Sequence, residues 1–184
     1  MRKSIIRIIA LLLFASVSVA FAQQPKSEKL VKIEQALKDD APKILCLNED
    51  FATAAQPREE AFAKLAANGF RSVLNLRTDA EGVDLKREQE LVEKSAVKYF
   101  NVPVVGSAPK TESVEAFIKV VKDKTNHPML IHCASANRVG AFWMIYRVVE
   151  QGWSEDKALE EATQIGLSSP GLKKFAQDYI ATHK

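Results

Sequence analysis

Cys133 and Arg138 are separated by four small residues, between an apolar run at 128–131 and a helical pattern that starts at Arg138. A cysteine between a strand end and a helix start lies among backbone N–H groups, which stabilise a thiolate and attract an oxyanion. The arginine adds a planar fork for two oxygens of that anion. The pattern therefore predicts that Cys133 is a catalytic nucleophile. The predicted phosphate-binding residues are Ala134, Ser135, Ala136, Asn137 and Arg138.

The same stretch allows a simpler interpretation, in which Cys133 is a buried strand residue and Arg138 a surface residue of a helix. The order strand, cysteine, small loop, arginine, helix favours the oxyanion site. Ala136 stands where glycine would be easier if the loop requires a positive φ. His132 is interpreted as a packed residue that bonds to the backbone rather than as a general base.

Short apolar runs alternate with helical patterns along the chain, and this order predicts the fold class. Strands are expected at 43–47, 70–76, 97–105 and 129–131. Helices are expected at 27–37, 57–69, 83–96, 111–121, 138–151, 154–165 and 170–182. The alternation predicts an α/β fold: a central, mostly parallel sheet of four to five strands flanked by helices, with a C-terminal helical cluster.

Three loops of this fold should meet near the cysteine. In open parallel sheets, ligands bind beyond the carboxyl ends of the strands. The loops at 77–82, 105–111 and 133–138 each follow an expected strand, so they should share that edge. We therefore expect the acidic residues of the first two loops to lie near Cys133.

Residues 1–22 have the features of a cleaved signal peptide. A basic start at 1–7 precedes an apolar core at 8–14, and Ala20-Phe21-Ala22 matches the small-residue cleavage pattern. The apolar core is shorter than the roughly 20 residues of a membrane-spanning helix, which disfavours an uncleaved anchor. We expect cleavage after Ala22 and a secreted protein, periplasmic if the source is a Gram-negative bacterium.

Removal of the leader changes the charge of the chain. Without Arg2, Lys3 and Arg7, the 26 Lys and Arg residues fall to 23, which equals the 23 Asp and Glu residues. A neutral mature chain gives no support for nucleic-acid binding, and we expect no membrane contact after cleavage. Its length fits one domain, and we expect an N-terminal helical extension at 23–40 before the α/β domain at 41–184. The histidine and cysteine spacings match no metal site, and neither metal nor cofactor is expected.

Two cysteines, Cys46 and Cys133, remain after cleavage. An exported protein with two cysteines can form a disulfide, and such a bond would block the proposed nucleophile reversibly. Cys46 lies within the apolar run 44–47, where a small buried core residue is the favoured interpretation.

Several segments together resemble a known family. His132-Cys133 with Arg138 is similar to the active loop of dual-specificity cysteine phosphatases, and 69–77 resembles their upstream strand. With the segments 51–57 and 102–104 and the shortened loop, the chain resembles the bacterial beta-lactamase-hydrolase-like phosphatase-like family of the protein tyrosine phosphatase superfamily. The resemblance implies a protein-tyrosine-phosphatase-like fold and hydrolysis of a phosphate monoester through a phosphocysteine. In that reaction Cys133 is the nucleophile and Arg138 the phosphate ligand.

The general acid of the resembling enzymes has no direct counterpart in this chain. Their aspartate would follow the strand that ends near 105, yet the segment 106–110 contains no carboxylate. Among Asp79, Glu81 and Glu112, we select Asp79 as the candidate acid, and an ordinary loop role for it stays equally open. A chain without an efficient acid should hydrolyse aryl phosphates faster than alkyl phosphates.

Two other functions remain open from the sequence. Rhodanese-like sulfurtransferases also carry a cysteine on a short loop after a strand, and a loop with four rather than five intervening residues suits a persulfide. Against this, Ala134 stands where many such loops have arginine. A non-catalytic oxyanion-binding module is the third hypothesis, which the missing aspartate supports. A phosphorylated small molecule or protein is the expected substrate in the favoured hypothesis.

Overall fold

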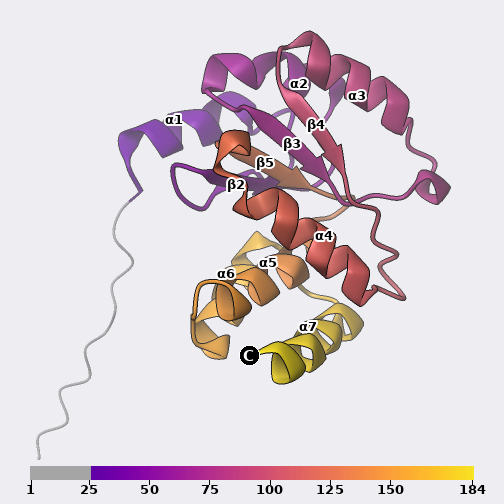
Figure 1. Cartoon of the computed structure of the whole chain (residues 1–184). Helices are drawn as coiled ribbons and strands as arrows, with labels where there is room; N and C mark the ends of the chain where they lie inside the picture. The colour runs from indigo at the N-terminus through magenta and orange to yellow at the C-terminus, as the bar shows by residue number, and fades with distance from the viewer. Residues whose placement is uncertain (1–25) are drawn as a thin grey trace, which may run out of the picture.

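The protein, in a computed structural model, is described over residues 26–184, so the expected signal peptide lies outside the described residues. A five-stranded sheet has the order β1-β2-β5-β3-β4 (Figure 1). Strands β2, β5, β3 and β4 are parallel, and β1 pairs antiparallel with β2. The bounds are β1 Leu45–Cys46, β2 Phe51–Ala54, β3 Ser72–Asn75, β4 Lys98–Asn101 and β5 Met129–His132. The predicted α/β class with a mostly parallel sheet is confirmed.

Helices cover both faces of the sheet (Figure 1). On one face lie α1 (Glu28–Leu37), α2 (Glu59–Lys64) and α3 (Leu85–Lys94), which share a core cluster with Val73 and Leu130. The other face packs against α4 (Thr111–Lys122), α5 (Asn137–Val149), α6 (Glu155–Ile165) and α7 (Pro170–His183). Short 3-10 turns are η1 (Ala66–Asn68), η2 (Asp79–Glu81) and η3 (Lys124–Asn126). The last three helices form the predicted C-terminal cluster.

Side-chain caps define where several helices begin. The Ser27, Asp84, Ser154 and Ser169 side chains accept hydrogen bonds from backbone N–H groups three residues later. Such caps satisfy donors that the first helical turn leaves without an intrahelical partner. The expected starts of the last two helices, at 154 and 170, agree with α6 and α7 to within one residue.

Helix α5 is the buried centre of the second layer. Its residues 138–148 are all buried, which fits a helix that is covered by a sheet on one side and by helices on the other. Gly140 permits the close approach of α6, because a Cβ at that position would lie 2.7 Å from the carbonyl oxygen of Ala162. The helix that leaves the cysteine is therefore held rigidly by its neighbours.

The structure corrects two details of the expected strands. The short strand β2 was missed, because Phe51-Ala52-Thr53-Ala54 lacks a β-branched run and follows the apolar segment 44–47 after only three residues. Residues 102–105, expected as the end of the same strand, lie outside β4. Val102 N–H still donates to Asn75, but the next bond runs from Val104 N–H to Leu76 and leaves the regular ladder register. Helix α1, in the expected N-terminal extension, buries Leu30 and Leu37 in the core of the sheet. Within residues 26–184, no helix is long and apolar enough to cross a membrane.

Candidate active site

The cysteine loop, residues 133–138, begins where three parallel strands end together. In the sheet register, His132 at the end of β5 pairs with Ala54 of β2 and Asn75 of β3. Cys133 follows directly and is fully buried. The carboxyl edge of the sheet thus holds the candidate nucleophile, as the parallel topology predicts.

The carbonyl groups of the cysteine loop point away from its interior. The Ala134 carbonyl accepts from the Gln56 backbone N–H at 3.3 Å, and the Ser135 carbonyl accepts from Lys43 Nζ at 3.1 Å. In a trans peptide the N–H points opposite to the C=O of the same unit. The N–H groups of Ser135 and Ala136 therefore face the other side, and within residues 26–184 neither has an acceptor. Together with the first turn of α5 they form an anion-binding cradle.

Ala136 adopts the left-handed conformation that the short loop requires. Its φ is 69°, so an alanine occupies a position that glycine would adopt more easily. Gly166, after α6, packs against this corner, and a Cβ there would lie 3.1 Å from the Ala136 Cβ. Asn137 Oδ1 accepts from the backbone N–H groups of Ser168 and Ser169 at 2.7 and 2.8 Å. The Asn137 side chain thus anchors the loop to the helical cluster, which leaves its backbone N–H for an anion.

Arg138 connects the three loops that were expected to meet at this edge. Its Nη1 donates to the carbonyl oxygens of Leu76 and Val104 at 3.1 and 2.8 Å. Its Nη1 and Nη2 also donate to Glu81 Oε1 and Oε2 at 2.6 and 2.7 Å. Within residues 26–184, Nε and the second Nη2 hydrogen bond to no protein oxygen, so this edge of the guanidinium, near the Cys133 thiol, is left for an oxyanion. The predicted meeting of the loops is observed.

The Arg138–Glu81 ion pair fixes the charge of both groups. The Arg138 hydrogen bond, the largest cause, lowers the Glu81 pKa to about 2. Burial opposes the charge of Arg138, yet Glu81 and the neighbouring Cys133 raise the Arg138 pKa above its usual value. Glu81 is therefore ionised at neutral pH and is not available as a proton donor.

Asp79, the candidate acid, is exposed on the η2 turn. No hydrogen bond or ion pair within residues 26–184 joins its carboxylate to Cys133 or Arg138. Glu81, two residues later on the same turn, is the carboxylate that reaches the loop. The role of Asp79 as general acid stays a prediction.

A buried polar cluster lies behind the cysteine, around His132. His132 is fully buried, and its Nε2 lies 3.2 Å from Glu88 Oε1 of α3, within ion-pair distance. The same Glu88 oxygen accepts from Asn75 Nδ2 at 2.6 Å and from Tyr99 Oη at 3.0 Å. Gln56 Nε2 donates to the other oxygen at 2.7 Å. The expected bond from His132 to the backbone is absent among the described residues.

The sequence analysis did not identify Glu88, although a signal for it exists. Glu88 lies three residues after Leu85 and four before Val92, on the apolar face of α3. Residues with this spacing share one face of a helix, so an acidic residue among them is a candidate for a buried polar contact. Lys43 and Gln56 come from distant segments, and no local pattern indicates their contacts with the loop.

Comparison with protein families identifies the chain over most of its length. Residues 22–180 match the family model described as "DSP-PTPase phosphatase fused to NAD+ Kinase". The Beta-lactamase hydrolase-like protein of Xylella fastidiosa is 30% identical over 120 residues, which cover 62% of this chain and 27% of that protein. The Dual specificity protein phosphatase TpbA of Pseudomonas aeruginosa is 39% identical over 54 residues, 29% of this chain and 25% of TpbA. The matches thus span about a quarter of these relatives.

Solved structures share the fold at lower identity. A Shewanella putrefaciens protein with the family designation DUF442 superposes with a TM-score of 0.69 at 22% identity, over 83% of this chain and 98% of that chain. The core domain of the PP-IP phosphatase Siw14 of Saccharomyces cerevisiae superposes with a TM-score of 0.66 at 19% identity, over 76% and 86%. The match to 22–180 and these shared folds confirm the family resemblance. The chain therefore belongs to the DSP-PTPase family of phosphatase-like proteins, within the dual-specificity and protein tyrosine phosphatase superfamily.

Proposed function

We propose that this protein is an exported, cysteine-dependent phosphatase that hydrolyses a phosphate monoester through a phosphocysteine intermediate. One observation carries the proposal: the cysteine loop sets a buried thiol beside Arg138, whose guanidinium is fixed by Glu81. The unpaired N–H groups of the loop and the free edge of Arg138 supply donors for the oxygens of a phosphoryl group. The membership of a phosphatase-like family supports this chemistry.

The proposed reaction has two steps at one phosphorus atom. The Cys133 thiolate attacks phosphorus, an S–P bond forms, and the bond to the leaving oxygen breaks. The leaving oxygen takes a proton, from Asp79 in our hypothesis or from water for an acidic aryl alcohol. Water then attacks phosphorus, the S–P bond breaks, and inorganic phosphate leaves while the thiolate is restored. Arg138 holds two equatorial oxygens throughout.

The substrate class follows from the donors of the site. Backbone N–H groups and one arginine recognise a phosphate dianion, with no requirement for a metal in the proposed step. TpbA is named a dual specificity protein phosphatase and Siw14 a PP-IP phosphatase, so relatives of this fold act on both protein and small-molecule phosphates. We propose a phosphorylated protein or small molecule as the substrate of this chain.

Hydrolysis of an aryl phosphate tests the proposal. We expect turnover by the reduced mature protein, a loss of at least ~10³-fold in Cys133→Ser, and a phosphoryl adduct on Cys133 after acid quench. Asp79→Asn should slow alkyl esters more than aryl esters, since a general acid is worth about 10²–10⁴-fold for poor leaving groups. Unchanged hydrolysis in Cys133→Ser would exclude the covalent mechanism.

The remaining hypotheses give different results in the same preparation. Transfer of sulfur from thiosulfate to cyanide that depends on Cys133 would assign the sulfurtransferase activity. If neither reaction occurs with the reduced thiol, while phosphate raises the melting temperature, the protein is an oxyanion-binding module. Sequencing of the N-terminus of the exported protein tests the localisation, and we expect it to begin at Gln23.

A further inference from the structure

We propose that Glu88 is a positioning residue for the nucleophile Cys133, and that it acts through the imidazole of His132. The inference rests on the proposed function, because it assigns a role to groups behind the reacting thiol. Glu88 does not touch the cysteine loop itself. Its carboxylate reaches His132, and one peptide bond joins His132 to Cys133.

The first support is the isolation of the His132 ring. The ring is fully buried, and neither of its nitrogens makes a hydrogen bond within residues 26–184. Glu88 Oε1 lies 3.2 Å from Nε2, within ion-pair distance. A buried polar atom without a partner is unfavourable, and the Glu88 carboxylate, which can only accept, is the group placed to orient an Nε2–H of the ring.

The second support is the way in which Glu88 is itself held. Only 6% of the residue is exposed, and its two oxygens accept from Asn75, Tyr99 and Gln56, which lie on three separate elements. Burial raises the pKa of a carboxyl group, yet contacts with His132, Gln56 and Tyr99 leave the Glu88 pKa below its ordinary value. The group is thus an anion at neutral pH, fixed at a position from which it reaches the imidazole.

The third support is a hydrogen-bonded connection to the other side of the cysteine loop. Gln56 bonds to Glu88 and accepts from Arg77 Nη1 at 3.0 Å. Arg77 Nε donates to Glu81 at 3.1 Å, and Glu81 holds Arg138. One network therefore supports the loop both before Cys133 and at Arg138. Networks of this kind place reacting groups within the narrow tolerance that catalysis requires.

The groups that face the pair come from each element packed against it. Tyr99 of β4 lies 3.0 Å from Glu88, and its pKa is raised, mainly by burial and then by Glu88, so it stays neutral. Asn75 of β3 and Gln56 after β2 are uncharged donors. Phe62 of α2 contributes an apolar ring 6.3 Å from the imidazole. The charged groups around them include Arg77, which bonds to Gln56, and Glu59, Asp84 and Arg87, which line a pocket together with Glu88.

The test measures the reactivity of Cys133 rather than hydrolysis. Alkylation by iodoacetamide is followed against pH in wild type, Glu88→Gln and Glu88→Asp. In Glu88→Gln the side chain keeps its shape but loses its negative charge. The His132 imidazole then lacks a charged acceptor, and we expect it to stabilise the Cys133 thiolate less. We expect about tenfold slower alkylation near pH 6.5 and a profile midpoint about one pH unit higher in Glu88→Gln. Glu88→Asp keeps the negative charge on a shorter side chain, so its alkylation midpoint should lie between those of wild type and Glu88→Gln.

Tyr99→Phe is the matched control, since it removes a different donor from the same carboxylate. We expect a loss of melting temperature comparable to that of Glu88→Gln, with a wild-type alkylation midpoint. His132→Gln should show the shift of Glu88→Gln, and the double variant should shift no further. A wild-type midpoint in Glu88→Gln and Glu88→Asp, despite lower melting temperatures, would show a merely structural role and overturn the proposal.

Failure of the proposed function gives a different pattern. If the protein does not hydrolyse phosphate esters, wild type shows no turnover, whereas the alkylation profiles still report on Cys133 and Glu88. If it does hydrolyse them, Glu88→Gln should lower kcat about tenfold near pH 6.5 with KM unchanged, and the difference should shrink at higher pH. A higher KM with an unchanged kcat in Glu88→Gln would contradict a positioning role.

Discussion

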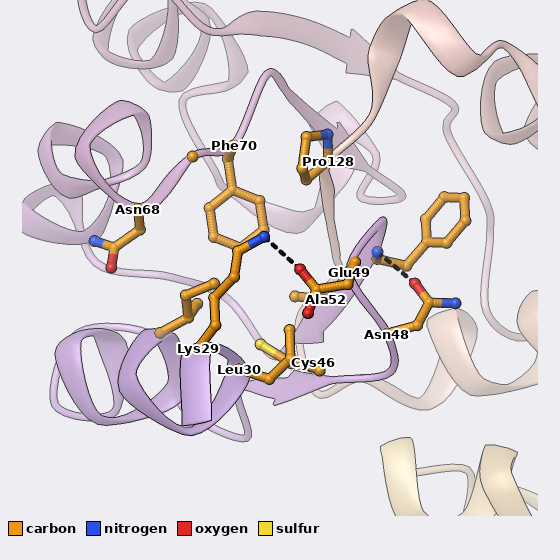
Figure 2. A pocket seen from close by; sticks show the side chains of 12 residues that line it. Lys29, Leu30, Cys46, Asn48, Glu49, Ala52, Asn68, Phe70 and Pro128 are labelled. Carbon is orange, nitrogen blue, oxygen red and sulfur yellow. Dashed lines mark hydrogen bonds and ion pairs between the residues drawn. The ribbon is translucent and has the colours of Figure 1, made fainter. Parts of the chain in front are cut away.

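The two cysteines of this protein are equally buried and lie at opposite edges of the sheet. Cys46 of β1 is 2% exposed, and Cys133 is 0% exposed. Cys46 lines a cavity of about 40 Å³ at the amino ends of β2, β3 and β5, where Figure 2 shows its sulfur close to Leu30. There, burial and the nearby Glu34 carboxylate raise the Cys46 pKa to about 11. The amino edge therefore keeps its thiol protonated and inert.

At the carboxyl edge, Cys133 lies near a positively charged group, whereas Cys46 lies near the Glu34 carboxylate. Arg138 lies beside Cys133, and within residues 26–184 the N–H groups of Ser135 and Ala136 have no acceptor. We propose that the charges and dipoles at the two edges, rather than burial, set the reactivity of the two thiols.

The sheet also keeps the two cysteines apart. Both thiols are unpaired. In the register, Cys46 is level with Ala52 and Leu130, whereas Cys133 lies three residues further along and two strands away. At about 3.3 Å per residue and about 4.8 Å per strand, the Cα atoms are separated by well over the roughly 7 Å limit for a disulfide. The expectation that Cys46 is a small core residue is confirmed.

Competitive alkylation should give the largest difference between the two edges. At neutral pH, a thiol with a pKa of about 11 has a thiolate fraction of only ~10⁻⁴. We expect iodoacetamide to label Cys133 at least ~10³-fold faster than Cys46, as measured by peptide mass spectrometry. In denaturant the two rates should become equal. Similar labelling rates for Cys133 and Cys46 in the folded protein would contradict the proposed difference between the two edges.

Arg138→Lys should have the next largest effect. Lysine keeps the charge but loses the planar fork and the bonds that tie three loops together, so kcat for an aryl phosphate should fall about 10²-fold. Arg147→Lys is the matched control, because Arg147 is a buried arginine bonded to Glu161 through Nε and Nη2 at 2.6 and 2.8 Å, within the helical cluster. It should lower stability and leave kcat at the wild-type value.

Glu81→Gln should make the stability of the protein less dependent on acid. The Glu81 pKa is lowered to about 2, so the unfolded chain binds its proton at higher pH than the folded chain does. The ion pair therefore stabilises fully above about pH 4.5 and loses its contribution as pH falls toward 2. Urea unfolding across this range should show wild type more stable by about 1 kcal/mol near pH 7, with the difference vanishing in acid. A difference in unfolding free energy between wild type and Glu81→Gln that does not change with pH would contradict a stabilising Glu81–Arg138 ion pair.

Cys46→Ala should have the smallest effect. Removal of one buried sulfur costs about 1 kcal/mol of unfolding free energy, and it should leave kcat and the labelling of Cys133 unchanged. Thermal unfolding and aryl phosphate hydrolysis measure the two quantities. A loss of activity in this variant would show that the amino edge communicates with the carboxyl edge, which the present comparison does not predict.

Much of the fold follows from short patterns in the chain. The strand–cysteine–loop–arginine–helix order, the parallel sheet and the C-terminal helices were predicted because each depends on neighbouring residues. The sequence left the φ of Ala136 open, and the structure shows that it is positive. Strand β2 escaped prediction because its four residues carry no strong strand preference, and pairing with β5 stabilises it instead.

The candidate site shows the same division at the level of single side chains. The types and order of Cys133 and Arg138 were evident from the chain alone, since a helix start follows the cysteine within a few residues. The long-range contacts were not evident, because Glu81 reaches Arg138 across 57 positions of sequence and Glu88 reaches His132 across 44. Packing of α3 against the sheet and convergence of the loops at one edge select these contacts. Local chemistry thus determined which residues can react, and the tertiary structure decided which charges hold them.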